Sequence, residues 1–283
     1  MATDMMLIKI NGSGKPRSAL GERAMKLRIS KSIAAFAVSY LLSSAPTCAQ
    51  KVYITNYRSN NVSVIDTTIN KVIATASGII SPYGVAVSPD RSKAYVTGVS
   101  GAISNISVID TASDTIIGTI SYPLQGGAGA VGIAFSPDGK EVYVTNTRPA
   151  DTLSVIDTRT NTVIATIPVG DNPVGLAVSP NGSKVYVANY DDDHVSVIDT
   201  ATNTVVANIP AISSGFGVAI TPDGSKVYVT NLAGVSVIQA LTDSVIATIA
   251  VGLSNTNPYG LAVTPDGSKV YVANEGSLAL QQS

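Results

Sequence analysis

The densest group of ionisable side chains in the sequence is a run of three aspartates and the chain's single histidine, namely Asp191, Asp192, Asp193 and His194. Carboxylates and an imidazole could together hold a divalent cation. The four residues are consecutive, however, so in an extended loop they point in different directions. No glycine-turned loop with ligands at alternate positions surrounds them. We therefore expect a solvated hairpin tip here, and no metal.

Catalytic roles for the remaining ionisable residues find little support in the sequence. No acid is placed by the sequence to orient His194 as a general base. One His and one Cys exclude metal sites that need several such ligands, and a disulfide scaffold. The balance of 18 Lys and Arg against 19 Asp and Glu excludes a basic nucleic-acid protein. We expect no catalytic residues, no cofactor and no nucleic-acid partner.

The elements that carry these residues form a repeat that covers most of the chain. A segment of the type KVYVTN recurs six times, with spacings of 42, 48, 43, 42 and 43 residues between its tyrosines. These tyrosines are Tyr53, Tyr95, Tyr143, Tyr186, Tyr228 and Tyr271. A repeat of this length holds about four short strands, which is the size of one propeller blade.

Each period divides into four β-branched segments of the types VGLAVSP, KVYVTN, VSVID and VIATI, which we call strands A, B, C and D. SPDG-type turns join A to B, and DTATNT-type turns join C to D. In the first copy, SPDR, Arg91 replaces the turn glycine, so we expect slight strain there. We also expect two repeated sets of residues to act as turn caps that accept backbone amides. They are the aspartates that end strand C (Asp66, Asp110, Asp157 and Asp199) and the asparagines that end the YVTN-type segment (Asn56, Asn146, Asn189, Asn231 and Asn274).

Strand A carries Gly and Ala at fixed offsets, as expected of a crowded innermost strand. The strands are apolar on both faces, so both faces must be covered. The sequence therefore predicts an all-β fold, a β-propeller of four-stranded antiparallel blades.

The YVTN, VSVID and SPDG units resemble the YVTN-type β-propeller repeat of archaeal and bacterial surface proteins. The resemblance covers nearly all of residues 51–276. It implies a propeller, commonly seven-bladed, at a cell surface or in the periplasm, and it implies no single activity. Similar propellers include binding modules, haem- or quinone-carrying domains and lactonase-like enzymes.

The number of repeats does not fit a closed ring. The repeat region starts at a strand B and ends after a strand B, with residues 278–280 aligning to a weak strand C. We expect about five to six blades, in a ring that is awkwardly closed, open or completed by a partner. A fragment of a longer seven-bladed propeller is an alternative. An open last blade would leave an apolar edge that favours self-association.

The loops that vary between repeats are those joining B to C and D to A, and in an up-and-down blade both sets lie on one face. Variation on one face of a uniform scaffold is typical of a binding face. Drift of loops without function is the alternative. The innermost strands supply no Asp, Glu, His, Lys or Arg there. The candidate binding residues are Tyr57, Arg58, Tyr83, Tyr122, Arg148, Asp171, Tyr190, Asp191, Asp192, Asp193, His194 and Tyr259.

Residues 1–49 differ in composition from the repeats. They carry seven Lys and Arg against two acids, then an apolar run at 33–42 and small residues before Ala49. This order predicts a secretory signal peptide cleaved after Ala49, with translation starting at Met25 and residues 1–24 as an upstream extension. The apolar run is too short to span a bilayer. We expect residues 50–283 to form the propeller, secreted to the periplasm or cell surface, with no membrane span after cleavage.

Three functional hypotheses follow from these observations. The leading one is an exported, non-catalytic propeller that binds a protein or glycan of the cell envelope. The second is an enzyme of the lactonase-like or redox-cofactor class, which requires polar loop residues that converge over the axis. The third is a fragment of a longer propeller.

Overall fold

The structure is a computed structural model that describes residues 5–6, 27–28, 51–100, 103–123, 129–210, 212–251 and 256–276. Most of the predicted leader at 1–49, and the weak strand at 278–280, lie outside the described residues. Within the leader, β1 (Met5–Met6) pairs with β2 (Leu27–Arg28).

The other strands form successive antiparallel sheets, which we number as blades 1 to 6. Blade 1 contains β3 (Lys51–Asn56), β4 (Asn61–Asp66) and β5 (Lys71–Ser77), with the 3₁₀ turn η1 (Tyr57–Ser59) between the first two. Blade 2 contains β6 (Pro82–Val87), β7 (Lys93–Ser100), β8 (Ile103–Asp110) and β9 (Thr115–Pro123). Blade 3 contains β10 (Ala130–Phe135), β11 (Glu141–Asn146), β12 (Thr152–Asp157) and β13 (Thr162–Pro168).

The second half of the chain repeats this arrangement. Blade 4 contains β14 (Pro173–Val178), β15 (Lys184–Asn189), β16 (His194–Asp199) and β17 (Thr204–Pro210). Blade 5 contains β18 (Val218–Ile220), β19 (Lys226–Asn231), β20 (Gly234–Gln239) and β21 (Ser244–Ile249). Blade 6 contains β22 (Thr256–Val263) and β23 (Val270–Gly276).

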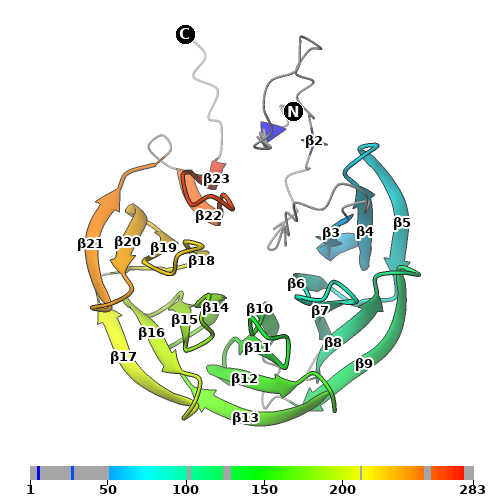
Figure 1. Ribbon diagram of the computed structural model, residues 1–283, viewed down its shortest axis with the longest axis horizontal. Coiled ribbons are helices and arrows are strands. Elements are labelled where there is room, and N and C mark those ends of the chain that lie inside the picture. The colour runs from blue at the N-terminus through cyan, green and yellow to red at the C-terminus, as the bar shows by residue number, and fades with distance from the viewer. Residues whose placement is uncertain are drawn as a thin grey trace.

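The blades are arranged around a central axis as an arc, with the A strands innermost and the D strands outermost (Figure 1). Within the described residues, four complete four-stranded blades lie between a three-stranded first blade and a two-stranded last blade. The predicted all-β propeller of four-stranded antiparallel blades is confirmed. The strand pairing of the described residues agrees with the expected five to six blades.

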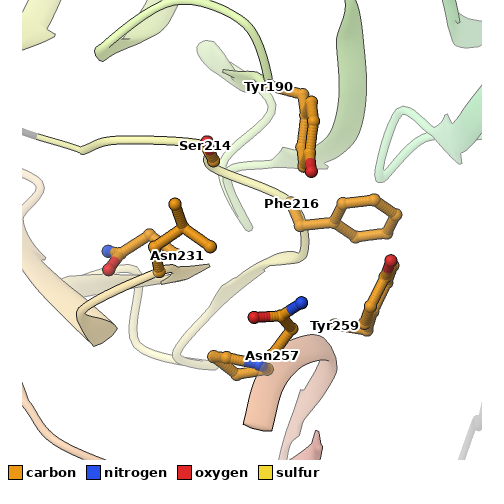
Figure 2. A pocket seen from close by; sticks show the side chains of 8 residues that line it. Tyr190, Ser214, Phe216, Asn231, Asn257 and Tyr259 are labelled. Carbon is orange, nitrogen blue, oxygen red and sulfur yellow. The ribbon is translucent and has the colours of Figure 1, made fainter. Parts of the chain in front are cut away.

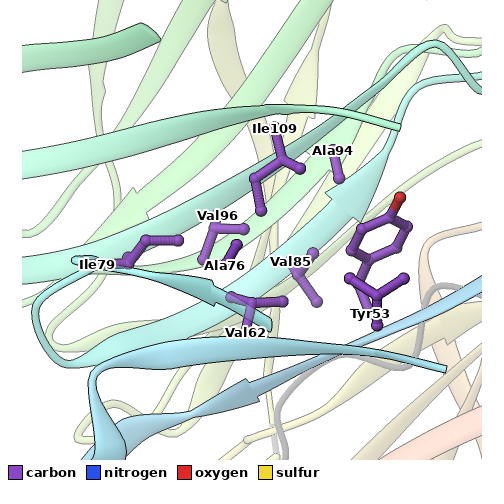
Figure 3. Packing of buried hydrophobic residues seen from close by; sticks show 9 residues of the cluster. Tyr53, Val62, Ala76, Ile79, Val85, Ala94, Val96 and Ile109 are labelled. Carbon is purple, nitrogen blue, oxygen red and sulfur yellow. The ribbon is translucent and has the colours of Figure 1, made fainter. Parts of the chain in front are cut away.

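Successive blades pack through apolar side chains. In the cluster between blades 1 and 2, Tyr53 and Val62 meet Val85, Val96 and Ile109, all at most 2% exposed (Figure 3). Each sheet between two neighbours thus buries both faces. This accounts for strands without a polar face and for the low content of charged residues, 13%.

The glycine of strand A is required by the close approach of the next blade. A Cβ on Gly132 would lie 2.2 Å from the carbonyl oxygen of Val174, and one on Gly175 would lie 2.0 Å from that of Phe216. Gly260 occupies the same position in blade 6 and has nothing within 4 Å among the described atoms. The predicted role of these glycines in close backbone packing is confirmed for the blades that have a following neighbour.

The threonine of the YVTN segment joins adjacent blades at the same place. The hydroxyl of Thr145 donates to the carbonyl oxygen of Val174 in the next blade, at 2.8 Å, and accepts from the amide of Gly132, also at 2.8 Å. Thr55, Thr97 and Thr230 donate to the next blade in the same way. Ala188 replaces the threonine in blade 4.

Replacing this hydroxyl by a methyl group tests its contribution. Thr145→Val keeps the shape but leaves the amide of Gly132 and one acceptor of Val174 without their partner in a buried place. We expect the free energy of unfolding to fall by about 2 kcal/mol, measured by urea denaturation. Thr166→Val, at an exposed position of β13 in the same blade, is the control for the intrinsic effect of the exchange. An equal loss in both variants would contradict the inter-blade role.

The C–D turns provide a second contact between blades. The tip residues Asn70, Asp114, Asn161, Asn203 and Asp243 all have positive φ, between 48° and 57°. Tyr53 Oη donates to Asp114 at 2.9 Å, and Lys51 Nζ lies 2.8 Å from the same carboxylate. Burial and this carboxylate raise the pKa of Tyr53. A tip residue such as Asp114 therefore holds its blade to strand B of the preceding blade, through a hydrogen bond and an ion pair.

The aspartates that end strand C act as turn caps, as predicted. Asp110 accepts from the amide of Ser113 at 2.8 Å, and Asp66, Asp157 and Asp199 make equivalent bonds. The asparagine that ends strand B was expected to act in the same way. Asn231 does so, since its Oδ1 accepts from the amide of Ala233 at 2.8 Å. For Asn189 the expectation is wrong, because its buried Oδ1 has no hydrogen-bond partner among the described residues. The Nδ2 of Asn146 donates to Ser154 Oγ of the neighbouring strand, at 2.8 Å.

The A–B turns also behave largely as the SPDG motif predicts. Their glycines have φ near +70°, and Arg91 adopts φ +62° where the other turns have glycine, so the predicted strain lies at Arg91. Asp223 accepts hydrogen bonds from the side chain of Thr221 and from Ser225. These bonds, the one from Thr221 foremost, lower the pKa of Asp223 to about 2. Asp138 and Asp266 are lowered to about 2 in the same way.

These carboxylates make folding sensitive to acid. Their pKa is lower in the folded chain than the usual value near 3.9, so their stabilisation is complete above about pH 4 and is lost as the pH falls towards 2. Asn181 makes the same bonds in the SPNG turn, at 2.7 and 3.1 Å. The triple variant Asp138→Asn, Asp223→Asn and Asp266→Asn should therefore fold. Its free energy of unfolding should fall less than that of the unchanged chain between pH 4 and pH 2. An equal loss, measured by urea denaturation at each pH, would contradict this assignment.

Candidate functional site

The variable loops of blades 3 and 4 bring together charged residues that the sequence did not connect. Arg148, in the B–C loop of blade 3, is bonded to the carboxylate of Asp191 and lies 4.0 Å from that of Asp171. Asn172 Nδ2 donates to Asp191 at 2.8 Å. Three predicted candidates thus form one ion-pair group on the face that carries these loops.

The rest of the acidic run lies in the tight turn between β15 and β16, as expected for a hairpin tip. Asp192 Oδ2 accepts from the amide of Asp171 at 2.7 Å and lies 3.9 Å from Nδ1 of His194. Asp193 is exposed, and its carbonyl accepts from the amide of Ile212. His194 begins β16, the third strand outward in its blade, and pairs with Pro210. In the parts of the chain that the structure describes, no group of three His, Cys, Asp or Glu could hold a metal ion.

Aromatic rings from three successive blades meet beside the axis. Tyr190 belongs to the B–C loop of blade 4, Phe216 precedes β18 of blade 5, and Tyr259 lies in β22 of blade 6. The centroids of Tyr190 and Phe216 are 5.9 Å apart, and those of Phe216 and Tyr259 are 4.4 Å apart, both edge to face. Figure 2 shows Phe216 between the two tyrosines. We call these three residues the aromatic cluster.

The aromatic cluster borders a small pocket of about 260 Å³, including the space open to solvent. It is lined by Tyr190, Ser214, Phe216, Asn231, Leu232, Asn257, Pro258 and Tyr259. Asn257 is exposed, and Ser214 is half-buried. Asn231 is held by the scaffold, since its Nδ2 donates to Ser236 Oγ and its Oδ1 accepts from the amide of Ala233. The pocket thus offers ring faces, hydroxyl groups and an amide to a ligand.

A second aromatic pair lies at the other end of the arc. Tyr57 in η1 and Tyr83 in β6 pack edge to face, with centroids 5.7 Å apart. Burial, and to a smaller extent Tyr57, raises the pKa of Tyr83. Arg58 is exposed next to this pair. Tyr57 and Tyr83 thus lie together, Arg58 follows Tyr57 in the chain, and Tyr83 occupies the same strand position as Tyr259.

Several candidates of the variable loops lie in strands, since Tyr83, His194 and Tyr259 fall in β6, β16 and β22, and Tyr122 lies well inside a strand. Tyr122 was placed in the D–A loop beginning at residue 121, but β9 extends to Pro123 and Tyr122 pairs with Ser104. The strand runs on because β7 and β8 are also longer than their counterparts, so the pairing continues. The side chain of Tyr122 lies outside the described residues.

Of the residues at this pocket, Tyr190 and Tyr259 were predicted from the sequence, whereas Phe216, Ser214 and Asn257 were not. A signal was present for Phe216. The residue before the strand A glycine is aromatic in Tyr83, Phe216 and Tyr259 and valine in the other two copies. These positions lie next to one another around the axis, so the repeat alone could have identified Phe216. Ser214 lies in an irregular loop, where repeat spacing carries no information, and Asn257 lies near the start of β22, which begins earlier than the other A strands.

The described residues contain no helix long and apolar enough to cross a membrane. Their only helical element is the three-residue turn η1.

Comparisons with known proteins agree with this architecture. Residues 92–216 match the family model of the cytochrome D1 heme domain. The chain is 35% identical over 119 residues to the seven-bladed beta-propeller protein Rv1057 of Mycobacterium tuberculosis (strain ATCC 25618 / H37Rv), a match that covers 41% of this chain. The chain spans less than a third of that relative, since the match covers 29% of its length.

A solved structure is similar over more of the chain. The hydrazine synthase of Kuenenia stuttgartiensis superposes with a TM-score of 0.70 and 26% identity, over 78% of this chain and 70% of that one. The strand pairing and these likenesses point to the same conclusion: this chain is a β-propeller.

Proposed function

We propose that this chain is an exported, non-catalytic β-propeller that binds a neutral glycan of the cell envelope through the aromatic cluster. The observation that carries the proposal is that Tyr190, Phe216 and Tyr259 come from three blades and meet at one pocket on the variable face. Export rests on the predicted leader at 1–49. The resemblance to the YVTN repeat of surface proteins supports the same location.

The chemistry of the pocket favours a sugar. Aromatic rings pack against the apolar face of a ligand and supply contact area at low entropic cost. The phenol groups of the two tyrosines, Ser214 and the amide of Asn257 are suited to exchanging hydrogen bonds with hydroxyl groups. The pocket is open to solvent, so a ligand would lie against its ring faces rather than be enclosed, as one ring of a longer sugar chain could.

Charge near the pocket selects against acidic polymers. Asp171, Asp191, Asp192 and Asp193 lie in the loops of the same face, and Arg148 is already paired with two of them. An anionic polysaccharide would meet repulsion there. We therefore expect neutral oligosaccharides to bind better than acidic ones, and this preference to weaken as the salt concentration rises.

The test is an array of neutral and acidic oligosaccharides, followed by calorimetric titration of the best neutral binder. Tyr190→Ala combined with Tyr259→Ala should weaken binding at least tenfold, because each removes a ring from the contact. Leu241→Ala is the matched control, since Leu241 is 86% exposed on a C–D turn, away from the variable loops. Absence of any neutral glycan binder would overturn the proposal, and capture of an envelope protein by the same cluster would replace the glycan by a protein partner.

A cofactor-binding propeller is the second candidate, supported by the matches to a cytochrome D1 heme domain and to hydrazine synthase. The described residues do not fit an anionic tetrapyrrole. The single histidine, His194, is on the third strand of its blade and faces Asp192. Four aspartates lie in the loops of the variable face, and the pocket is small. Titration with haemin tests this directly: a stoichiometric shift of the haem absorbance that His194→Ala abolishes would favour the cofactor over the glycan.

A further inference from the structure

We propose that the outer edge of β23 is a docking site for a β-hairpin of another polypeptide, one with β-branched strands and an aspartate at the tip of its turn. Within the described residues, β23 pairs with β22 only, whereas its counterpart β19 pairs with both β18 and β20. An antiparallel strand can therefore add to β23 in the register that β20 has on β19. This inference concerns the opening of the ring and is independent of the pocket.

Side chains of blade 5 are placed to recognise the tip of such a hairpin. In blades 1 and 4 a lysine and a tyrosine of strand B hold the tip aspartate of the next blade, as Lys184 and Tyr186 hold Asp243 at 2.7 and 2.9 Å. Blade 5 carries the same pair, Lys226 and Tyr228. The hairpin that adds to β23 would bring its tip to this pair.

The strand B side chains of blades 5 and 6 are more exposed than their counterparts in the preceding blades. Tyr53, Tyr95, Tyr143 and Tyr186 are at most 2% exposed. Tyr228 at the same position is only half-buried, and Lys226 is exposed. Val270 and Val272 of β23 are also half-buried, whereas Val227 and Val229 of β19 are 0% exposed. The apolar strands of a hairpin would complete this layer.

Each tip aspartate that follows another blade faces a lysine. Asp114 and Asp243 face Lys51 and Lys184. Where blade 3 has Glu141 in place of the lysine, the tip of the next blade is the neutral Asn203. A lysine also precedes a neutral tip once, since Lys93 of blade 2 is followed by Asn161, which accepts from Tyr95 at 2.7 Å. Lys226 is therefore suited to an acidic tip on the docked hairpin, as Lys51 and Lys184 are.

The experiment uses the full chain and a synthetic peptide with the sequence of residues 234–250, which is the β20–β21 hairpin with Asp243 at its tip. We expect one peptide to bind per chain and to slow hydrogen exchange at those amides of residues 270–276 that point away from β22. The peptide with Asp243→Lys should bind about tenfold more weakly, and the chain with Lys226→Glu should restore its binding. Lys226 is exposed, so this variant should fold, which circular dichroism verifies.

Three results would overturn the proposal. The first is that the amides of residues 270–276 remain unprotected at millimolar peptide. The second is that the same amides are already protected in the chain alone, because its own terminal residues or a second copy cover the edge. The third is that wild-type chain binds the Asp243→Lys peptide as well as the unchanged one.

Discussion

Gly175→Ala is expected to lower the free energy of unfolding by about 3 kcal/mol, the largest effect of any substitution considered in the scaffold. The new Cβ would lie 2.0 Å from the carbonyl oxygen of Phe216, well inside contact distance, and the obstacle is backbone rather than a flexible side chain. Blades 4 and 5 would have to separate to admit it. Urea denaturation followed by circular dichroism measures the change.

Gly260→Ala is the matched control, since Gly260 has the same place in its strand but nothing within 4 Å among the described atoms. We expect it to change stability by less than about 0.5 kcal/mol. Equal losses in both variants would mean that Gly260 is covered in solution. No loss in Gly175→Ala would contradict the close packing of the blades.

Asp243→Ala is expected to destabilise the chain by about 1 to 3 kcal/mol, through the lock between blades 4 and 5. The carboxylate accepts from Tyr186, which is 1% exposed, and pairs with Lys184. Its removal leaves both groups without their main partner. Alanine would also have to adopt the left-handed backbone of this tip, at φ +48°.

Asp243→Asn separates these contributions. Asparagine tolerates the left-handed conformation and still accepts from the tyrosine, as Asn161 does from Tyr95 at 2.7 Å. Only the partly exposed ion pair with Lys184 is lost, which should cost less than about 1 kcal/mol. A thermal or urea unfolding series in which both variants lose equally would show that the ion pair, rather than the tyrosine bond, carries the lock.

The scaffold was predictable because every blade repeats the same pattern of four strands and the same turn motifs. Periodicity located the strands, and the SPDG motif located the A–B turns. The recurrence of small residues at fixed positions of strand A indicated that Gly175 lies in a crowded strand. The sequence could not show that the tip of one blade is held by the preceding one, because Tyr186 and Asp243 are separated by more than a full repeat.

The candidate site was predictable only in part. Tyr190 and Tyr259 were found because they interrupt the repeat in variable loops. The ion-pair group of Arg148, Asp171 and Asp191 was not found, because it joins the loops of neighbouring blades and depends on how far each loop reaches. The turn cap predicted for Asn189 does not form, since its buried Oδ1 has no partner among the described residues, and the path of the loop that follows it is not given by the repeat spacing.

The most direct test of the proposed function is hydrogen exchange of the full chain with and without its best neutral oligosaccharide. We predict slower exchange in the segments that carry the aromatic cluster, around residues 190, 214–217 and 257–260, and no change at the C–D turns. A footprint confined to the C–D turns, or the absence of any footprint at saturating oligosaccharide, would contradict the assignment of the aromatic cluster as the glycan-binding site.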